Sequence, residues 1–171
     1  VWKLLKNTDP VHKVSIISRW WALWVTWFLP ERDALLVSKE KYLDELTVLY
    51  WGRAAEEVFY WKDKITTWAS NDIERATKIA RQMVTRYGMF EEIGAENFES
   101  NIDKYSGTGE KPFVSNETIQ KIDEKVKQIL KQAYEKAVLL IKENKELHEK
   151  ITKDLLAKEE LSKEESDAYF A

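Results

Sequence analysis

Apolar side chains recur every three or four residues along three long stretches of the chain, which predicts helices with one buried face. These stretches are residues 38–61, 71–88 and 115–141. Charged residues, Asp44 among them, fill most of the remaining positions of the first stretch. Apolar residues at three-to-four spacing over 147–156 predict a further helix. We therefore expect a mainly α fold whose C-terminal part is a helical bundle.

Residues typical of helix ends border these stretches. Asn71, with Glu74 three residues later, predicts an N-cap of the capping-box type for the second helix, and Gly88 predicts its end. Ser115 predicts the N-cap of the third helix. Ser162 predicts the start of a short final helix, because Glu165 again follows it at capping-box spacing.

Residues 11–29 are rich in β-branched and aromatic side chains, which predicts two strands joined around residues 18–21. The second strand is apolar on both faces, so we expect it to be covered. Pro30 ends it, because proline lacks the N–H group that a strand must donate. The chain should thus carry a short β-hairpin near its N-terminus.

We expect one domain over residues 1–171. Its parts are the hairpin region (1–35), a helical region (36–90), a loop (91–114) and the C-terminal helices (115–171). The loop lacks a hydrophobic period and is rich in turn-forming residues, so we expect it to be mobile.

Composition excludes several kinds of chemistry. A net charge of −3 shows no basic excess, so we expect no nucleic-acid partner. The absence of cysteine excludes disulfides, thiolate zinc sites and a cysteine nucleophile, and two histidines are too few for a multi-histidine site. No phosphate-binding loop or serine-nucleophile motif occurs, and no apolar run approaches the ~20 residues needed to span a bilayer.

A few acidic residues stand out, although ordinary structural roles explain them as well. Asp72 falls in the first turn of a helix, where the unpaired N–H groups stabilise a carboxylate. Glu56 and Glu57 come from the preceding helix and could reach the same region, or could lie on an exposed face with Arg53. Taken alone, these residues indicate a mainly helical domain and no reaction.

Three segments change this interpretation: DPVHKVSII at 9–17, LYWGRAAEE at 49–57 and ASNDIERATKIARQMVTRYGM at 69–89. With the run SNETIQKIDEKV at 115–126, they resemble the peptidase domain of the FtsH family of membrane-bound, ATP-dependent zinc proteases. The resemblance extends to about residue 165. It implies a zinc metalloendopeptidase that degrades membrane and misfolded proteins.

In that family an H-E-x-x-H helix supplies two histidines and the catalytic glutamate, and an aspartate on a later helix completes the zinc site. Asp72 matches this aspartate, which would place the metal site in the helical region. The resemblance assigns Glu56 and Glu57 a supporting or structural role beside the zinc. It assigns the binding of substrate, as an added strand, to Ala22, Leu23, Trp24, Val25 and Thr26.

The H-E-x-x-H motif is expected to end a few residues before Val1, so we expect no catalytic residue in the chain and no peptide hydrolysis by it alone. The domain that uses ATP and Mg²⁺ and the transmembrane segments are expected upstream as well. The resemblance implies a homohexamer, polypeptide substrates and a location at the cytoplasmic face of the bacterial inner membrane. Membrane contact would come only from those upstream segments.

A different class of function stays open, namely a non-catalytic helical module for interaction or oligomerisation. In that case the apolar stripe from Ile119 to Ile141 would dock on a partner helix. The upstream DNA distinguishes the two, because an H-E-x-x-H motif just before Val1 supports the protease and a start codon there supports the module.

Tryptophan is unusually frequent, with eight residues against five glycines. The family pattern has glycine at six of these positions: Trp2, Trp20, Trp24, Trp51, Trp61 and Trp68. Tryptophan fits neither the space nor the backbone of a glycine turn. One hypothesis is that UGA codons meaning glycine were read as tryptophan, and the alternative is a designed or genuinely aromatic-rich relative. The codons decide between them.

Overall fold

The computed structural model describes residues 2–8, 11–17, 25–28, 36–60, 66–98 and 114–170. Its α-helices are α1 (Lys39–Leu49), α2 (Trp51–Tyr60), α3 (Ser70–Thr85), α5 (Asn116–Glu143), α6 (Lys145–Lys158) and α7 (Lys163–Ala168). Its shorter elements are the 3₁₀ turns η1 (Trp2–Leu4) and η3 (Thr67–Ala69) and the strands β1 (Val11–Ser15), β2 (Val25–Phe28) and β3 (Glu160–Ser162). The mainly α fold with a hairpin near the N-terminus is confirmed.

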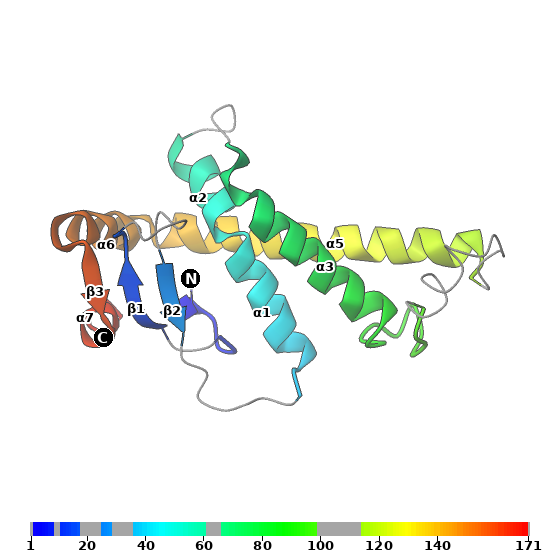
Figure 1. The fold of residues 1–171 in the computed structure, drawn as a ribbon. Helices are drawn as coiled ribbons and strands as arrows, with labels where there is room; N and C mark the ends of the chain where they lie inside the picture. The colour runs from blue at the N-terminus through cyan, green and yellow to red at the C-terminus, as the bar shows by residue number, and fades with distance from the viewer. Residues whose placement is uncertain are drawn as a thin grey trace.

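Helices α1, α2 and α3 pack against the long helix α5, and we call these four helices the bundle (Figure 1). The buried side of α5 repeats at helical spacing, as the sequence pattern predicts, through Ile122, Val126, Ile129, Ala133, Ala137 and Ile141. Small residues of α2 and α3, such as Ala54 and Ala80, are fully buried and let the helices approach closely. Ser115 accepts the N–H of Thr118, so the predicted N-cap of α5 is confirmed.

The single helix predicted over 38–61 is instead two helices, α1 and α2, separated at Tyr50. Gly52, a poor helix former, comes two residues later. The ring of Tyr50 packs edge-on against Tyr134 of α5, with 5.6 Å between the ring centroids. Both halves turn apolar residues toward α5, so the hydrophobic period continues across the break and conceals it.

The predicted N-cap at Asn71 is wrong. Helix α3 begins at Ser70, and its capping residue Ala69 makes no side-chain hydrogen bond. The turn η3 runs directly into α3, and Ala69 is buried. The preceding turn, rather than a side chain, therefore leads the chain into the helix.

Gly88 provides the change of direction after α3. Its φ of +57° is left-handed, and a Cβ atom there would lie 3.0 Å from the Cα of Ala95. Only glycine fits both conditions without strain.

The strands form an antiparallel sheet in the order β2-β1-β3. Ser15 pairs with Val25 of β2, and Val14 pairs with Leu161 of β3. The third strand was not predicted, because it has three residues and ends on the Ser162 cap of α7. That cap, a capping box with Glu165, is confirmed. We call η1, the sheet, α6 and α7 the sheet end, which lies beside the end of α5 where α6 begins (Figure 1).

Part of the segment predicted to be a mobile loop packs on the bundle. Phe98 is buried and its N–H donates to the carbonyl of Thr85 at 2.7 Å. Val114, just before α5, is also buried. Residues 99–113 lie outside the described residues, and the division of the chain into four parts stays a prediction.

Candidate functional site

Asp72 lies in the first turn of α3, half-buried, where the helix dipole favours a negative charge. Burial raises the pKa of its carboxyl group, and the nearby charge of Arg75 opposes this shift. Arg75 itself pairs with Glu45 of α1 at 2.7 Å. Within the described part of the chain, no hydrogen bond or ion pair holds the Asp72 carboxylate. A partly desolvated anion without a partner can accept a cation.

Glu56 links the end of α2 to the beginning of α3. One carboxylate oxygen accepts the hydroxyl of Thr66, and the other accepts the Thr66 N–H at 3.4 Å. Thr66 directly precedes η3, which continues into α3. Glu56 therefore contacts the segment that sets where the helix of Asp72 begins.

Glu57 has a different partner, because its carboxylate accepts the hydroxyl of Tyr134 on α5. Burial, together with this hydrogen bond and the Glu57 charge, raises the pKa of Tyr134 to about 12. The phenol thus stays protonated as a donor. One guanidinium nitrogen of Arg53 is buried and has no hydrogen-bond partner within the described residues. The alternative of a solvent-facing helix side with Arg53 and the two glutamates stays open, because all three residues are partly exposed.

The described residues do not form a complete metal site. No group of three or more histidine, aspartate or glutamate residues among them lies close enough to hold an ion. His12 is exposed on β1, whereas His148 of α6 stacks on Phe59 with 4.7 Å between ring centroids. The donor set that fits a metal here is thus a single carboxylate, Asp72. Because the H-E-x-x-H helix is expected to end just before Val1, Asp72 is expected to face the beginning of the chain. Val1 lies outside the described residues, so this stays a prediction.

Strand β2 lies at one edge of the sheet, with β1 on one side and no other strand paired to it among the described segments. Of the residues predicted to hold substrate, Val25 and Thr26 begin this strand and pair with Ser15 and Val14. Ala22, Leu23 and Trp24 lie outside the described residues. An edge strand offers free N–H and C=O groups to which an extended peptide can add.

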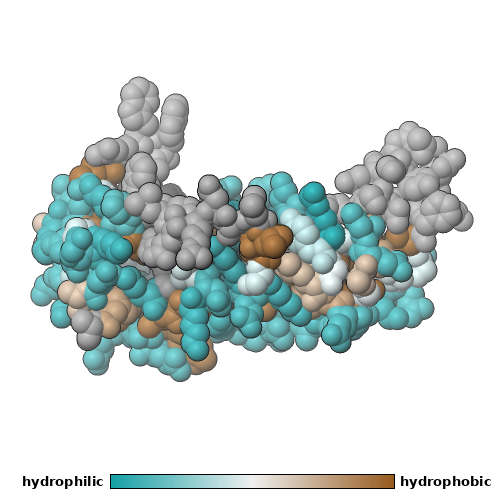
Figure 2. All heavy atoms as spheres, turned by 90° about the horizontal axis from the view of Figure 1, so that it is seen from below, coloured by the Kyte–Doolittle hydropathy of each residue, from teal (hydrophilic) through white to brown (hydrophobic). Residues whose placement is uncertain are grey.

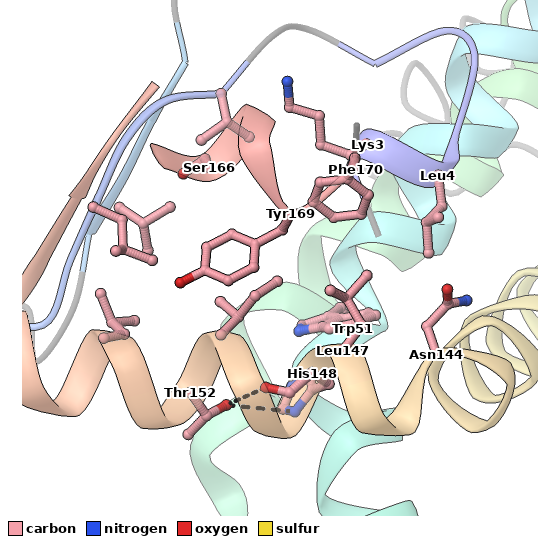
Figure 3. Close-up of a pocket in the computed structure, with 15 residues that line it drawn as sticks. Lys3, Leu4, Trp51, Asn144, Leu147, His148, Thr152, Ser166, Tyr169 and Phe170 are labelled. Atoms are coloured by element: carbon pink, nitrogen blue, oxygen red, sulfur yellow. Dashed lines mark hydrogen bonds between the residues drawn. The ribbon is translucent and has the colours of Figure 1, made fainter. Parts of the chain in front are cut away.

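The sheet end contains a pocket of about 210 Å³ that the sequence did not reveal. It is lined mostly by apolar side chains, and Tyr169 and Phe170 face Leu147 and His148 of α6 across it (Figure 3). Burial lowers the pKa of His148, while the charge of Glu149 opposes this shift. The lining comes from residues 3 to 170, so no local pattern could have predicted it.

The described surface is mainly hydrophilic on the face seen in Figure 2, with small apolar groups between the charged ones. Among the described helices, none combines the length and the apolar character that a membrane span requires.

Comparison with known proteins gives a consistent result. The chain matches peptidase family M41 over residues 1–168. It is 45% identical over 164 residues to the "ATP-dependent zinc metalloprotease FtsH" of Cupriavidus metallidurans, covering 95% of this chain and 25% of that protein. The protein of the same name from Clostridium perfringens is 45% identical over 163 residues, covering 95% of this chain and 22% of that protein. The chain thus spans about a quarter of the length of these relatives.

Proposed function

This chain belongs to peptidase family M41, and from that premise we propose that it forms part of the proteolytic domain of an ATP-dependent zinc metalloendopeptidase. The observation that carries the proposal is the half-buried Asp72 carboxylate, which lies in the first turn of α3 and has no partner among the described residues. It lies within one of the segments that resemble the family, and burial raises its pKa, so bringing a cation to it offsets an unfavourable desolvation.

In this proposal Asp72 supplies one zinc ligand, and the remaining ligands come from parts of the protein beyond the described residues. The chemistry that zinc would supply, when bound, is a water whose pKa is lowered to about 7. Glu56 keeps the beginning of α3 in place through Thr66. Strand β2 holds the peptide by main-chain hydrogen bonds. Because the chain carries no H-E-x-x-H motif, we expect it to hydrolyse no peptide by itself.

The names of the relatives support a dependence on ATP and zinc, and the family resemblance supports further proposals for the whole protein. An ATP-binding domain with Mg²⁺ would lie in the three quarters that the chain does not match. A homohexameric ring at the cytoplasmic face of the bacterial inner membrane would deliver membrane and misfolded polypeptides to the site. Segments beyond this chain would hold the ring at the membrane.

The proposal is tested in the whole protein with Asp72→Asn, which keeps the shape and removes the charge. Glu74→Gln is the matched control, because it removes one exposed charge from the beginning of the same helix. We expect Asp72→Asn to lose bound zinc, measured by elemental analysis, and to lose more than about 100-fold in peptide hydrolysis. Glu74→Gln should retain both.

Two outcomes contradict the proposal in different ways. If Asp72→Asn retains zinc and activity, Asp72 is not a ligand of the metal. If the wild-type protein binds no zinc and cleaves no peptide, the proposed peptidase function is contradicted. That result supports the non-catalytic helical module instead.

A further inference from the structure

Asp44 is a buried carboxylate in the middle of α1, with 6% of its surface exposed. The amphipathic pattern counts it among the exposed charges of the helix, so its burial needs a separate explanation. Its Oδ1 atom binds the ammonium group of Lys136 on α5 at 2.7 Å. Its Oδ2 atom accepts both the backbone N–H of Asn7 at 3.2 Å and the side-chain amide of Asn7 at 3.0 Å.

These contacts join separate parts of the molecule. Lys136 belongs to the bundle, as does Asp44 itself, whereas Asn7 lies in the turn between η1 and β1. Strand β1 is the central strand, so its position determines where β2 and β3 lie. A carboxylate that accepts two hydrogen bonds from one residue fixes both the position and the orientation of that turn.

Ring contacts between the bundle and the sheet end act on a different element. His148 of α6 stacks on Phe59 of α2 and so holds the helix that follows α5. Asp44 holds the segment that leads into β1. Asp44 therefore contributes to the placement of the sheet, and of its edge strand, against the bundle.

We propose that Asp44 is a positioning residue, which fixes edge strand β2 relative to α3, the helix that carries Asp72. The role in the reaction rests on the proposed function, since β2 would hold the peptide and Asp72 would hold the metal. A shift of about 1 Å between reacting groups can cost on the order of 100-fold in rate. Loss of the Asn7 contact therefore lowers kcat while peptide binding to the strand, and with it KM, changes little.

The structural part is tested on this chain with spin labels, because it has no cysteine and labels attach only where one is introduced. One label pair joins the sheet to the bundle through His12→Cys on β1 and Lys78→Cys on α3, both exposed. A second pair, Lys78→Cys with Gln132→Cys on α5, reports on the bundle alone. We expect Asp44→Asn to broaden the first distance distribution, measured by pulsed electron paramagnetic resonance, and to leave the second narrow.

Two further variants separate positioning from general stabilisation. Asn7→Ala removes the side-chain amide and leaves the Lys136 ion pair, so it should broaden the first distribution even if Asp44→Asn folds poorly. Lys136→Met removes the ion pair and leaves Asn7 in place, so it should lower Tm without broadening that distribution. A first distribution equally narrow in Asp44→Asn, Asn7→Ala and the parent overturns the inference.

The role in the reaction is tested by kcat and KM in the whole protein. We expect Asp44→Asn and Asn7→Ala to lower kcat about tenfold or more at nearly constant KM, and Lys136→Met to change kcat less. If Asp72→Asn abolishes hydrolysis while Asp44→Asn leaves kcat unchanged, the inference falls and the proposed function stands. If the wild-type protein hydrolyses no peptide, both the inference and the proposed function are contradicted.

Discussion

The bundle and the sheet end are packed in different ways. Buried apolar side chains from all four helices form a continuous core in the bundle, and Leu46, Met83 and Ile141 have no exposed surface. In the sheet end, neither α6 nor α7 as described contains a buried residue, and the pocket lies between them and the sheet. Polar contacts are prominent there, such as the Lys13–Glu160 ion pair at 2.6 Å.

This contrast shows how the two candidate roles are divided. The candidate metal ligand begins a helix of the tightly packed bundle, and the candidate peptide strand belongs to the less tightly packed sheet. Regions with few buried apolar contacts open locally at lower free energy than the core does. A rigid metal site and an adaptable substrate strand are compatible with this division.

The largest expected effect comes from removing a buried leucine in each region. Leu46→Ala should lower the free energy of unfolding by about 3 kcal/mol, because it leaves a cavity among fully buried side chains. Leu161→Ala should cost less, about 1–2 kcal/mol, because Leu161 already borders the pocket. Urea denaturation measures both values.

Hydrogen exchange then locates the damage. Leu161→Ala should speed exchange at Ile16, whose N–H donates to Glu159 across the sheet at 2.9 Å, and leave the amides of α5 protected. Equal losses of protection in both regions would show that the molecule opens as one unit. That result would contradict the difference in local stability between the bundle and the sheet end.

The helix caps test the same contrast with a smaller perturbation. Ser115→Ala should cost about 1 kcal/mol, because it uncaps the 28-residue helix around which the bundle is built. Ser162→Ala should cost less globally and instead fray α7, which has six residues. Ser115→Gly is the control and should cost only a few tenths of a kcal/mol. A larger global loss for Ser162→Ala would place α7 in the cooperative core.

The smallest effect concerns pH. Burial lowers the pKa of His148 in the folded chain, so the unfolded chain binds a proton more readily at that ring. Stability is therefore unaffected by this group above the unfolded pKa and falls as pH decreases through and below it. When the pH is lowered from about 7.5 to about 5.5, the titration of His148 should lower Tm by about 1–2 °C.

His148→Phe should remove this part of the pH dependence, as measured by thermal unfolding at each pH. His12→Gln, at the other and exposed histidine, should keep it. Identical profiles for His148→Phe and the parent chain would contradict the assignment.

Local patterns were sufficient to predict the bundle helices. Helical spacing located α3 and α5, and the side-chain caps at Ser115 and Ser162 formed as the sequence indicated. The break at Tyr50 escaped prediction, because both halves bury the same face. Strand β3 escaped it because its three residues gain strand structure only by pairing with β1, about 147 residues earlier.

The candidate site was less predictable from residues alone. Asp72 could be recognised as a helix-start carboxylate, but only the resemblance connected it with a metal. The burial of Asp44 depends on Asn7 and Lys136, which come from distant parts of the chain, so its position on a polar helix face concealed it. The same holds for the pocket, whose walls meet only in the folded molecule.

The pairing of β1 with β3 also orders events during synthesis. Strand β1 leaves the ribosome well before β3, the strand that covers its second edge, because the long helices lie between them in the sequence. Until then β1 exposes unpaired main-chain groups, which are prone to join other chains. A nascent or prematurely terminated polypeptide that stops before Glu160 therefore carries a persistent aggregation hazard, even where its helices have already assembled.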